Sequence, residues 1–328
     1  MNELTFESEA VVESLKDLGW QYKDAETIEE EREYDPKNVI CIEELRSTVA
    51  KLNPDIPQES QSEAINALLK IYEEDIVLAN ETFHTYITEG YSVEVRVDDE
   101  QRGRYVQFID WEHQGNNTFV VTNQFTVADK KTKRPDVVLL VNGLPLVLFE
   151  LKSPVAEEAT IDMAYRQIQN YKKAIPQLFY YNVLCIISDG FEAQAGTITS
   201  DRSRFLAWKS IFGESIDATV PEYETLTEGM LRPKILLDLI RSSTVFEKSS
   251  TKDKETNIQK IITIKKVAAY HQYFAVNKAL EKTLEATSEN GDRKIGVVWH
   301  TQGSGKSLSM VFYTGKLVQN LDNPTVVI

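Results

Sequence analysis

The chain has 328 residues, of which 42% are hydrophobic and 27% charged, as in an ordinary soluble globular protein of more than one domain. It has no apolar run of 18 residues, and its acidic start, MNELTFESEA, does not resemble a signal peptide, so we expect no membrane span and no secretion. The 2 cysteines lie far apart and the 4 histidines are scattered. This argues against a disulfide framework or a zinc site and favours the cytoplasm.

The net charge of −15 argues against a protein that simply coats nucleic acid. The charge is uneven, because residues 1–100 hold 8 basic and 26 acidic residues, whereas the remaining 228 hold 28 basic and 25 acidic. The second part is therefore compatible with DNA binding. The acidic third could be a solvated surface, a face for protein partners, or a shield against wrong DNA approaches, and the sequence does not choose between them.

The first hundred residues are predicted to be mainly helical. A helix from Phe6 to Leu18 would be capped by Thr5 and ended by Gly19. Further along, the hydrophobic patterns predict helices at 40–52 and 58–72, and strands within 83–97 and 103–127.

Two apolar runs then follow, Val137–Val141 and Pro145–Leu151, separated by an Asn-Gly pair at 142–143. Asn and Gly both tolerate positive φ, so the pattern predicts a β-hairpin. A three-residue loop would place Asp136 directly opposite Glu150. A two-residue loop would shift the pairing by one residue and still leave the two carboxylates neighbours.

Three charged side chains converge at the open end of this hairpin. Glu150 and Lys152 share one face of their strand because side chains alternate, and Asp136 approaches from the other strand. Two close carboxylates make a site for a hard cation such as Mg²⁺. The lysine could orient or activate a metal-bound water, or stabilise charge on a phosphate. The simpler interpretation is that these charges only mark strand ends.

This arrangement resembles the PD-(D/E)xK nuclease superfamily, with Pro135-Asp136 as the first half of the motif and Glu150-Leu151-Lys152 as the second. The resemblance implies that Asp136, Glu150 and the Leu151 carbonyl hold Mg²⁺ and that Lys152 assists the water. It also implies a metal-binding glutamate on an early helix. Glu9 is the candidate, Glu7 and Glu13 are alternatives, and a solvated acidic face is the simpler explanation.

A helix is predicted from about Thr160 to a point before Pro176, with Gln167 and Tyr171 on one face. Any polar helix can carry this spacing, but here it resembles the QxxxY motif of RecB-like nucleases, which implies contact with DNA near the scissile phosphate. A basic run ahead of the site could supply charge opposite the phosphates. Its members are Lys130, Lys131, Lys133 and Arg134.

The rest of the chain completes the predicted domain plan. We expect a buried strand at Leu178–Ser188, core anchors at Phe205 and Trp208, and helical structure within 226–246. The expected organisation is a nuclease domain at 1–247, a polar linker at 248–257, and the beginning of a second domain at 258–328. The expected fold class is α/β, with a mixed sheet flanked by helices as in restriction-endonuclease-like nucleases, followed by the beginning of a RecA-like domain.

A second chemical signal lies near the end of the chain. A predicted buried strand, Ile295–Trp299, runs into a glycine-rich loop and a helix, the context that a P-loop requires. Lys306 would reach the β- and γ-phosphates of ATP and Ser307 would bind its Mg²⁺. His300 replaces the first glycine of the general motif, which fits the looser motif I of superfamily 2 helicases. The expected loop residues are Thr301, Gln302, Gly303, Ser304, Gly305, Lys306 and Ser307.

Gln272 lies about thirty residues before this loop and resembles the glutamine that reads adenine in such motors. Together with the nuclease motifs, the segments at 270–280 and 299–310 resemble the R subunit of type I restriction-modification enzymes. The resemblance implies cleavage and ATP-dependent translocation of double-stranded DNA, with modification and specificity subunits as partners. An acid that binds the ATP metal and an arginine finger do not follow within the chain, so we expect no ATP hydrolysis by this chain alone.

Two alternatives remain open. The chain could be a non-catalytic assembly or DNA-binding module of a nuclease–helicase complex, which would have no reason to bind Mg²⁺ or Mn²⁺ at the hairpin. It could also belong to another nuclease–helicase fusion, such as a type III enzyme, although here the nuclease precedes the motor.

Overall fold

A seven-stranded mixed sheet forms the centre of the protein in the computed structural model, which describes residues 3–71, 73–97, 100–153, 160–216, 219–252, 259–299 and 301–326. The strand order is β1-β4-β7-β8-β9-β10-β11, and β8 and β9 run parallel at its middle. The strands are β1 (Gln21–Tyr22), β4 (Phe119–Asn123), β7 (Val137–Val141), β8 (Leu144–Leu151), β9 (Leu184–Ser188), β10 (Ala193–Gly196) and β11 (Leu206–Ala207).

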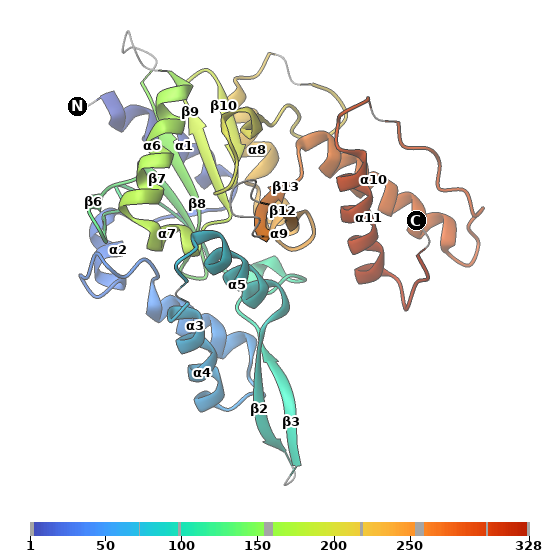
Figure 1. Ribbon diagram of the computed structural model, residues 1–328, viewed down its shortest axis with the longest axis horizontal. Helices are drawn as coiled ribbons and strands as arrows, with labels where there is room; N and C mark the ends of the chain where they lie inside the picture. Colours follow the sequence, from blue (N-terminus) through green and yellow to red (C-terminus); the bar gives the residue numbers. More distant parts are fainter. Residues whose placement is uncertain are drawn as a thin grey trace.

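Helices cover both faces of this sheet. In Figure 1, α6 (Ile161–Ala174) lies in front of the strands and α1 (Glu3–Asp17) lies behind them. The expected α/β class, with a mixed sheet flanked by helices, is therefore confirmed. The remaining helices of this part are α2 (Ala25–Glu31), α3 (Ile42–Leu52), α4 (Gln58–Leu69), α5 (Ile76–Glu89), α7 (Pro176–Tyr180) and α8 (Glu222–Met230).

Two hairpins form two-stranded sheets of their own beside the seven-stranded sheet. The ribbon of β2 (Tyr91–Val97) and β3 (Glu100–Val106) extends below α4 in Figure 1, and β5 (Val127–Ala128) pairs with β6 (Thr132–Lys133) just before β7.

The predicted central hairpin is present, and it contains both of the registers that the sequence allowed. At the tip, a two-residue turn pairs Val141 with Leu144 and Leu140 with Pro145. A bulge then shifts the pairing by one residue, so that Leu139 faces Val147 and Val137 faces Phe149. Asp136 and Glu150 are the next residues in this second register and therefore lie opposite each other.

The turn of this hairpin is buried. Asn142 and Gly143 adopt φ values of +54° and +79°, as a two-residue hairpin turn requires. The Asn142 amide nitrogen donates hydrogen bonds to the Phe108 carbonyl (2.9 Å) and to the Asn117 side chain (2.8 Å), and its oxygen accepts one from the Thr118 backbone (2.8 Å). These bonds fix the hairpin against the preceding loop.

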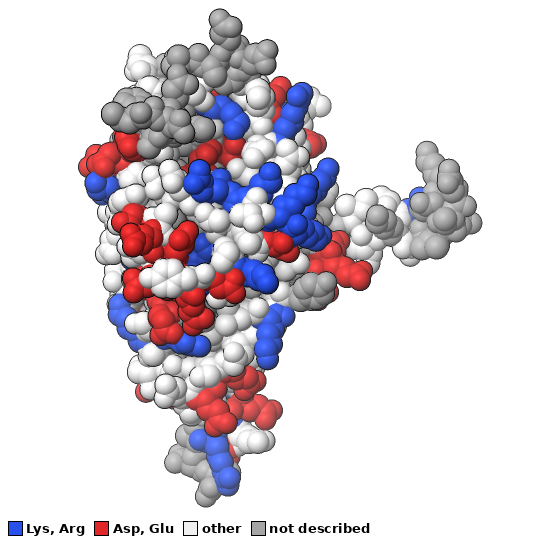
Figure 2. All heavy atoms as spheres, turned by 90° about the vertical axis from the view of Figure 1, so that its left-hand side faces the viewer, with Lys and Arg blue, Asp and Glu red and all other residues white. Residues whose placement is uncertain are grey.

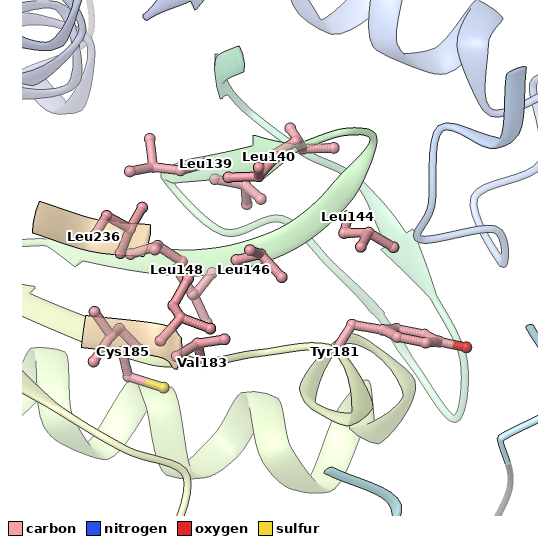
Figure 3. Packing of buried hydrophobic residues seen from close by; sticks show 14 of the residues in the cluster. Leu139, Leu140, Leu144, Leu146, Leu148, Tyr181, Val183, Cys185 and Leu236 are labelled. Atoms are coloured by element: carbon pink, nitrogen blue, oxygen red, sulfur yellow. The ribbon is translucent and has the colours of Figure 1, made fainter. Parts of the chain in front are cut away.

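Every residue of β7 and β8 is buried, including Glu150. Figure 3 shows leucines of both strands packed against Val183, Cys185 and Leu236. Strands that are covered on both faces read as continuous apolar runs, which explains why the sequence predicted this hairpin so clearly. Phe205 and Trp208 are also buried, each 3% exposed, as expected.

Several predicted elements are wrong in detail. Residues 83–89 belong to α5 and not to a strand, because their buried positions follow a helical period: Ala79, Phe83 and Ile87. Residues 178–180 belong to α7, and the strand begins only at Leu184. Thr5 lies within α1 and does not cap it.

The predicted linker at 248–257 is wrong where it is described. Residues 248–252 belong to β12 (Thr244–Lys252), which pairs over its whole length with β13 (Gln259–Val267); residues 253–257 lie outside the described part. The ribbon has exposed serine, threonine and lysine side chains, so its composition resembles a linker although its backbone is fully paired.

Lys265 fixes this ribbon to the part of the chain that surrounds the central sheet. The side chain is 1% exposed, and its Nζ donates hydrogen bonds to Asn80 Oδ1 (2.8 Å) and to the Asn182 carbonyl (3.0 Å). Its backbone carbonyl accepts hydrogen bonds from the hydroxyls of Thr197 (2.8 Å) and Thr199 (2.9 Å). The strand that leads into the C-terminal helices is therefore anchored in the first core.

The C-terminal helices are α9 (Pro233–Ser242), α10 (Tyr270–Thr287) and α11 (Lys306–Asn320). Lys316 of α11, which is 5% exposed, bonds to both Asp238 oxygens (2.5 and 2.6 Å) and to Asn277 Oδ1 (2.7 Å). The Lys316–Asp238 ion pair, with Asn277 beside it, thus joins α9, α10 and α11, which belong to two different predicted domains.

The predicted strand Ile295–Trp299 is not formed, and Val297 and Trp299 are 93% and 89% exposed. A buried strand needs neighbours that take its hydrogen bonds, and no strand in the described residues pairs with this segment. Among the helices of the described residues, none is long and apolar enough to cross a membrane.

The geometry at the hairpin turn gives a first prediction. Gly143→Ala should lower the free energy of unfolding by about 2 kcal/mol, since the residue has positive φ and a Cβ there would overlap the Cys41 carbonyl. Gly115→Ala is the matched control, because a Cβ at Gly115 meets no atom within 4 Å. Chemical denaturation of both variants would measure the effect, and equal stability would contradict the account.

Burial lowers the pKa of Lys265 to about 7, which gives a second prediction. Its titratable neighbours do not titrate between pH 7 and 10, because burial lowers the pKa of His84 to about 3 and raises that of Cys185 to about 12. Between pH 7 and 10, Lys265 is protonated in the unfolded chain but not in the folded chain. The contribution of Lys265 to the free energy of unfolding should therefore fall as the pH is lowered.

Lys265→Met removes this effect. Its free energy of unfolding relative to wild type should therefore rise by up to about 1.4 kcal/mol per pH unit from pH 10 to 7 and level off below. Lys266→Met is the control, because the Lys266 side chain is 39% exposed and pairs with Glu247 on the ribbon surface. Denaturation at pH 7, 8 and 9 measures the slope, and a flat difference for Lys265→Met would refute the assignment.

Candidate active site

Asp136, Glu150 and Lys152 meet at the open end of the central hairpin, as predicted. Asp136 immediately precedes β7, and its Oδ2 accepts a hydrogen bond from the Leu151 backbone N–H (2.7 Å). Lys152 Nζ donates to Glu150 Oε1 (2.5 Å). Glu150 is 2% exposed, whereas the Lys152 side chain is 23% exposed. The site therefore combines a buried carboxylate, Glu150, with a lysine whose side chain is partly exposed to solvent.

The two carboxylates perturb each other. Burial raises the pKa of Glu150 to about 7, and the nearby charge of Asp136 adds to this effect, while Lys152 opposes it. Burial also raises the pKa of Asp136, although the Leu151 N–H and Lys152 pull it back. A like charge close by, together with burial, disfavours ionisation of Glu150. A cation between them would remove this penalty.

One atom of the site has no partner among the described residues. Glu150 Oε2 is buried and makes no hydrogen bond, which is costly for a carboxylate oxygen. An unpaired oxygen next to a second carboxylate is the donor set that a hard divalent cation uses, so the residues fit Mg²⁺.

The third acidic ligand is not found at this site. Glu9 is exposed on α1, Glu13 pairs with Lys16 at the surface, and the side chain of Glu7 lies outside the described residues. Within the described chain, no three His, Cys, Asp or Glu residues lie together in a way that could hold a metal. The described site therefore offers two carboxylates, and the Leu151 carbonyl remains a predicted ligand.

Helix α6 places Tyr171 against the same carboxylates. Tyr171 is 3% exposed, and its hydroxyl donates a hydrogen bond to the Arg134 carbonyl (3.4 Å). Burial and the charge of Glu150 both raise its pKa. Tyr171 is therefore a buried neighbour of the two carboxylates in this structure, and its contact with DNA stays a prediction. Gln167 is half-buried one turn earlier, and its contact with DNA remains a prediction.

The basic run lies beside the site. Lys130, Lys131 and Arg134 are exposed, and Lys133 is half-buried in β6. The charge of Arg134 opposes the rise in the pKa of Asp136, so Arg134 lies near enough to the site to act on it electrostatically. Figure 2 shows Lys and Arg side chains gathered in a band on the face where α6 and β6 lie, next to groups of acidic side chains. A phosphate backbone would meet favourable charge along this band.

The glycine-rich loop has the expected form at its helix end. Gly303 and Gly305 have φ of +80° and +81°, and α11 begins at Lys306. Thr301, Gln302, Lys306 and Ser307 are exposed, and Ser304 is half-buried, so the loop faces outward. His300 lies outside the described residues.

The structure brings Gln272 to this loop. Its Nε2 donates to the Gly305 carbonyl (3.1 Å), and its Oε1 accepts from the Ala269 backbone (3.0 Å). Gln272 therefore connects the start of α10 to the loop.

The sequence carried no signal for the backbone contacts that complete the candidate site. The Leu151 N–H orients Asp136, and the Lys152 N–H donates to the Ser188 carbonyl of β9 (2.9 Å). Backbone groups are common to all residue types, so no side-chain pattern could have indicated them.

Comparison with known proteins gives the family of this chain. The sequence model of the family "Type I restriction enzyme R protein N terminus" matches residues 1–204, which include the whole nuclease site. The chain belongs to this family. Residues 271–328, which include Gln272 and the glycine-rich loop, match the SWI2/SNF2 ATPase family.

Curated relatives of this R protein carry the same kind of name. The chain is 41% identical over 328 residues to the type I restriction enzyme HindI endonuclease subunit of Haemophilus influenzae, covering 97% of this chain and 30% of that protein. It is 30% identical over 334 residues to the putative type I restriction enzyme MjaIXP endonuclease subunit of Methanocaldococcus jannaschii, covering 97% and 32%. The chain thus spans about a third of the length of these relatives.

Proposed function

We propose that this chain is the DNA-cleaving part of a type I restriction R subunit, and that it hydrolyses phosphodiester bonds with Mg²⁺ held by Asp136 and Glu150. The observation that carries the proposal is the carboxylate pair of half-buried Asp136 and buried Glu150. Glu150 Oε2 has no partner within the described chain, and Lys152 lies at the exposed edge of the pair. A structural ion pair would not need the second carboxylate. A cation site does, because two negative oxygens compensate one divalent charge.

Each side chain has a distinct role in this proposal. Mg²⁺ would polarise the phosphate and make a bound water more acidic. Lys152 keeps Glu150 Oε1 oriented through their 2.5 Å contact and offers its positive charge to the phosphate as negative charge develops. The Leu151 N–H orients Asp136. The Tyr171 hydroxyl lies close enough to Asp136 and Glu150 for their charges to act on it. Arg134 and the neighbouring lysines bring the DNA backbone to the site.

The glycine-rich loop supports a second proposed activity, ATP binding for DNA translocation. The backbone N–H groups at the start of α11 can bind phosphates, Lys306 is exposed at that end, and Gln272 is in place beside the loop. In the intact protein we propose that ATP hydrolysis moves double-stranded DNA, in a cytoplasmic complex with modification and specificity subunits. The names of the relatives, which are endonuclease subunits of type I restriction enzymes, support this assignment.

Alanine substitutions test the nuclease site. In the intact R subunit assembled with its partners, Asp136→Ala, Glu150→Ala and Lys152→Ala should each lower the rate of plasmid cleavage by about 1000-fold, since each removes a group that stabilises the reacting phosphate or its metal. ATP hydrolysis should persist. Glu192→Ala is the control, because this exposed carboxylate lies at the turn after β9. If the Asp136 and Glu192 variants cut equally well, the carboxylates are structural and the assembly-module alternative gains support.

A substitution in the loop tests the motor assignment. In the intact R subunit assembled with its partners, Lys306→Ala should reduce ATP hydrolysis and DNA translocation to background. The melting temperature should stay close to that of wild type, because Lys306 is exposed in the structure. Asp136→Ala serves as the reciprocal control, with normal ATP hydrolysis and no cleavage. Continued translocation by the Lys306 variant would refute the role of the loop.

A further inference from the structure

The position of Glu150 depends on one extra residue in β8. Pairing at the hairpin tip would, if it continued unchanged, put Asp136 opposite Phe149 and turn Glu150 to the other face of the sheet, because side chains alternate. The bulge at Leu146 shifts the pairing register by one residue, so that the Asp136 and Glu150 carboxylates lie on one face of the sheet. Any contact that stabilises the bulge therefore also sets the geometry of the site.

The segment before β9 holds this bulge. The Leu146 carbonyl accepts hydrogen bonds from the Val183 N–H (2.7 Å) and from Asn182 Nδ2 (3.3 Å). The side chains of Leu146 and Val183 also lie in the same region of the core in Figure 3. Asn182 is 1% exposed and makes a further bond from Nδ2 to the Leu184 carbonyl (2.8 Å), so its side chain has one defined orientation.

Asn182 is held in turn by two buried side chains from distant elements. The backbone carbonyl of Asn182 accepts hydrogen bonds from Asn80 Nδ2 of α5 (2.7 Å) and from Lys265 Nζ of β13 (3.0 Å). Lys265 Nζ also donates to Asn80 Oδ1 (2.8 Å). A buried lysine is costly, so its presence here calls for an explanation. Anchoring the ribbon alone would need only the hydrogen bonds that the Thr197 and Thr199 hydroxyls donate to the Lys265 backbone carbonyl.

We propose that Lys265 is a positioning residue for the nuclease site: it fixes Asn182, which with Val183 fixes the bulge at Leu146 and keeps Glu150 facing Asp136. The proposal rests on the proposed nuclease function. It assigns a part in cleavage to a strand that leads directly into α10 and the glycine-rich loop, 115 residues after Glu150 in the sequence. The role does not require a charged lysine, because a neutral amine keeps two N–H groups for its two acceptors.

The test uses the intact R subunit assembled with its partner subunits. Lys265→Met and Asn182→Leu each break one link with a side chain of similar size, and Lys266→Met is the control on the same ribbon. We expect the two link variants to lower the turnover number for DNA cleavage by about 100-fold, the loss that a misplacement of about 1 Å produces. The KM for DNA and the rate of ATP hydrolysis should stay within twofold of wild type, and Lys266→Met should behave as wild type.

Two measurements that do not depend on cleavage report on the site itself. Hydrogen exchange should become faster in residues 144–152, where the Leu151 amide is bonded to Asp136, but not in β4. Binding of Mn²⁺, measured by calorimetry without DNA, should weaken by about 10-fold or more. These changes should appear in Lys265→Met and Asn182→Leu alike, and the double variant should be little worse than either single variant, because both act through one chain of contacts.

The outcomes separate the two proposals. Wild-type cleavage and exchange in both link variants would overturn the positioning role while leaving the nuclease assignment intact. Faster exchange in β4 and β8 alike, with ATP hydrolysis falling in parallel, would also overturn it, because it would show general loosening of the fold. If Asp136→Ala cleaves as wild type does, the nuclease assignment fails first, and the positioning role fails with it.

Discussion

The structure depends on two carboxylates held together at the end of the central hairpin. Glu150 lies in a strand in which every residue is buried, and Asp136 is half-buried directly before the other strand. Burial raises both pKa values, and the charge of Asp136 raises that of Glu150 further. A fold accepts such a cost only where other groups compensate it. Here the Leu151 N–H and Lys152 compensate part of it and leave Glu150 Oε2 unpaired within the described residues, which leaves room for a cation.

Compensation of this kind requires that the carboxylates face each other, and the bulge in β8 is what makes them do so. A bulge is weaker than regular pairing because one residue is left without a partner across the strand. The Leu146 carbonyl instead finds its partners in Asn182 and Val183, outside the hairpin. The geometry of the site is thus connected to the packing of α5, β9 and β13, although none of these elements carries one of the proposed catalytic side chains.

The same packing joins the nuclease part to the glycine-rich loop. The ribbon of β12 and β13 is anchored by Lys265, and α11 is anchored on α9 by the contact between Lys316 and Asp238. Gln272 completes the connection by bonding to the Gly305 carbonyl at the start of α11. These polar contacts have fixed partners, so the loop and the core around the carboxylates are connected by side-chain bonds as well as by the chain itself.

The sequence by itself determined the central hairpin, its charged end and the helix that carries Gln167 and Tyr171, because continuous apolar runs, an Asn-Gly turn and helical spacing are local signals. It also indicated the loop at 301–307. The tertiary structure was needed to show that the hairpin contains both registers, since each is compatible with the local pattern and the bulge between them bonds to Asn182 and Val183 from further along the chain. The burial of Tyr171 and the paired ribbon at 244–267 were likewise beyond local signals, because burial and strand pairing depend on what the rest of the chain places against a segment.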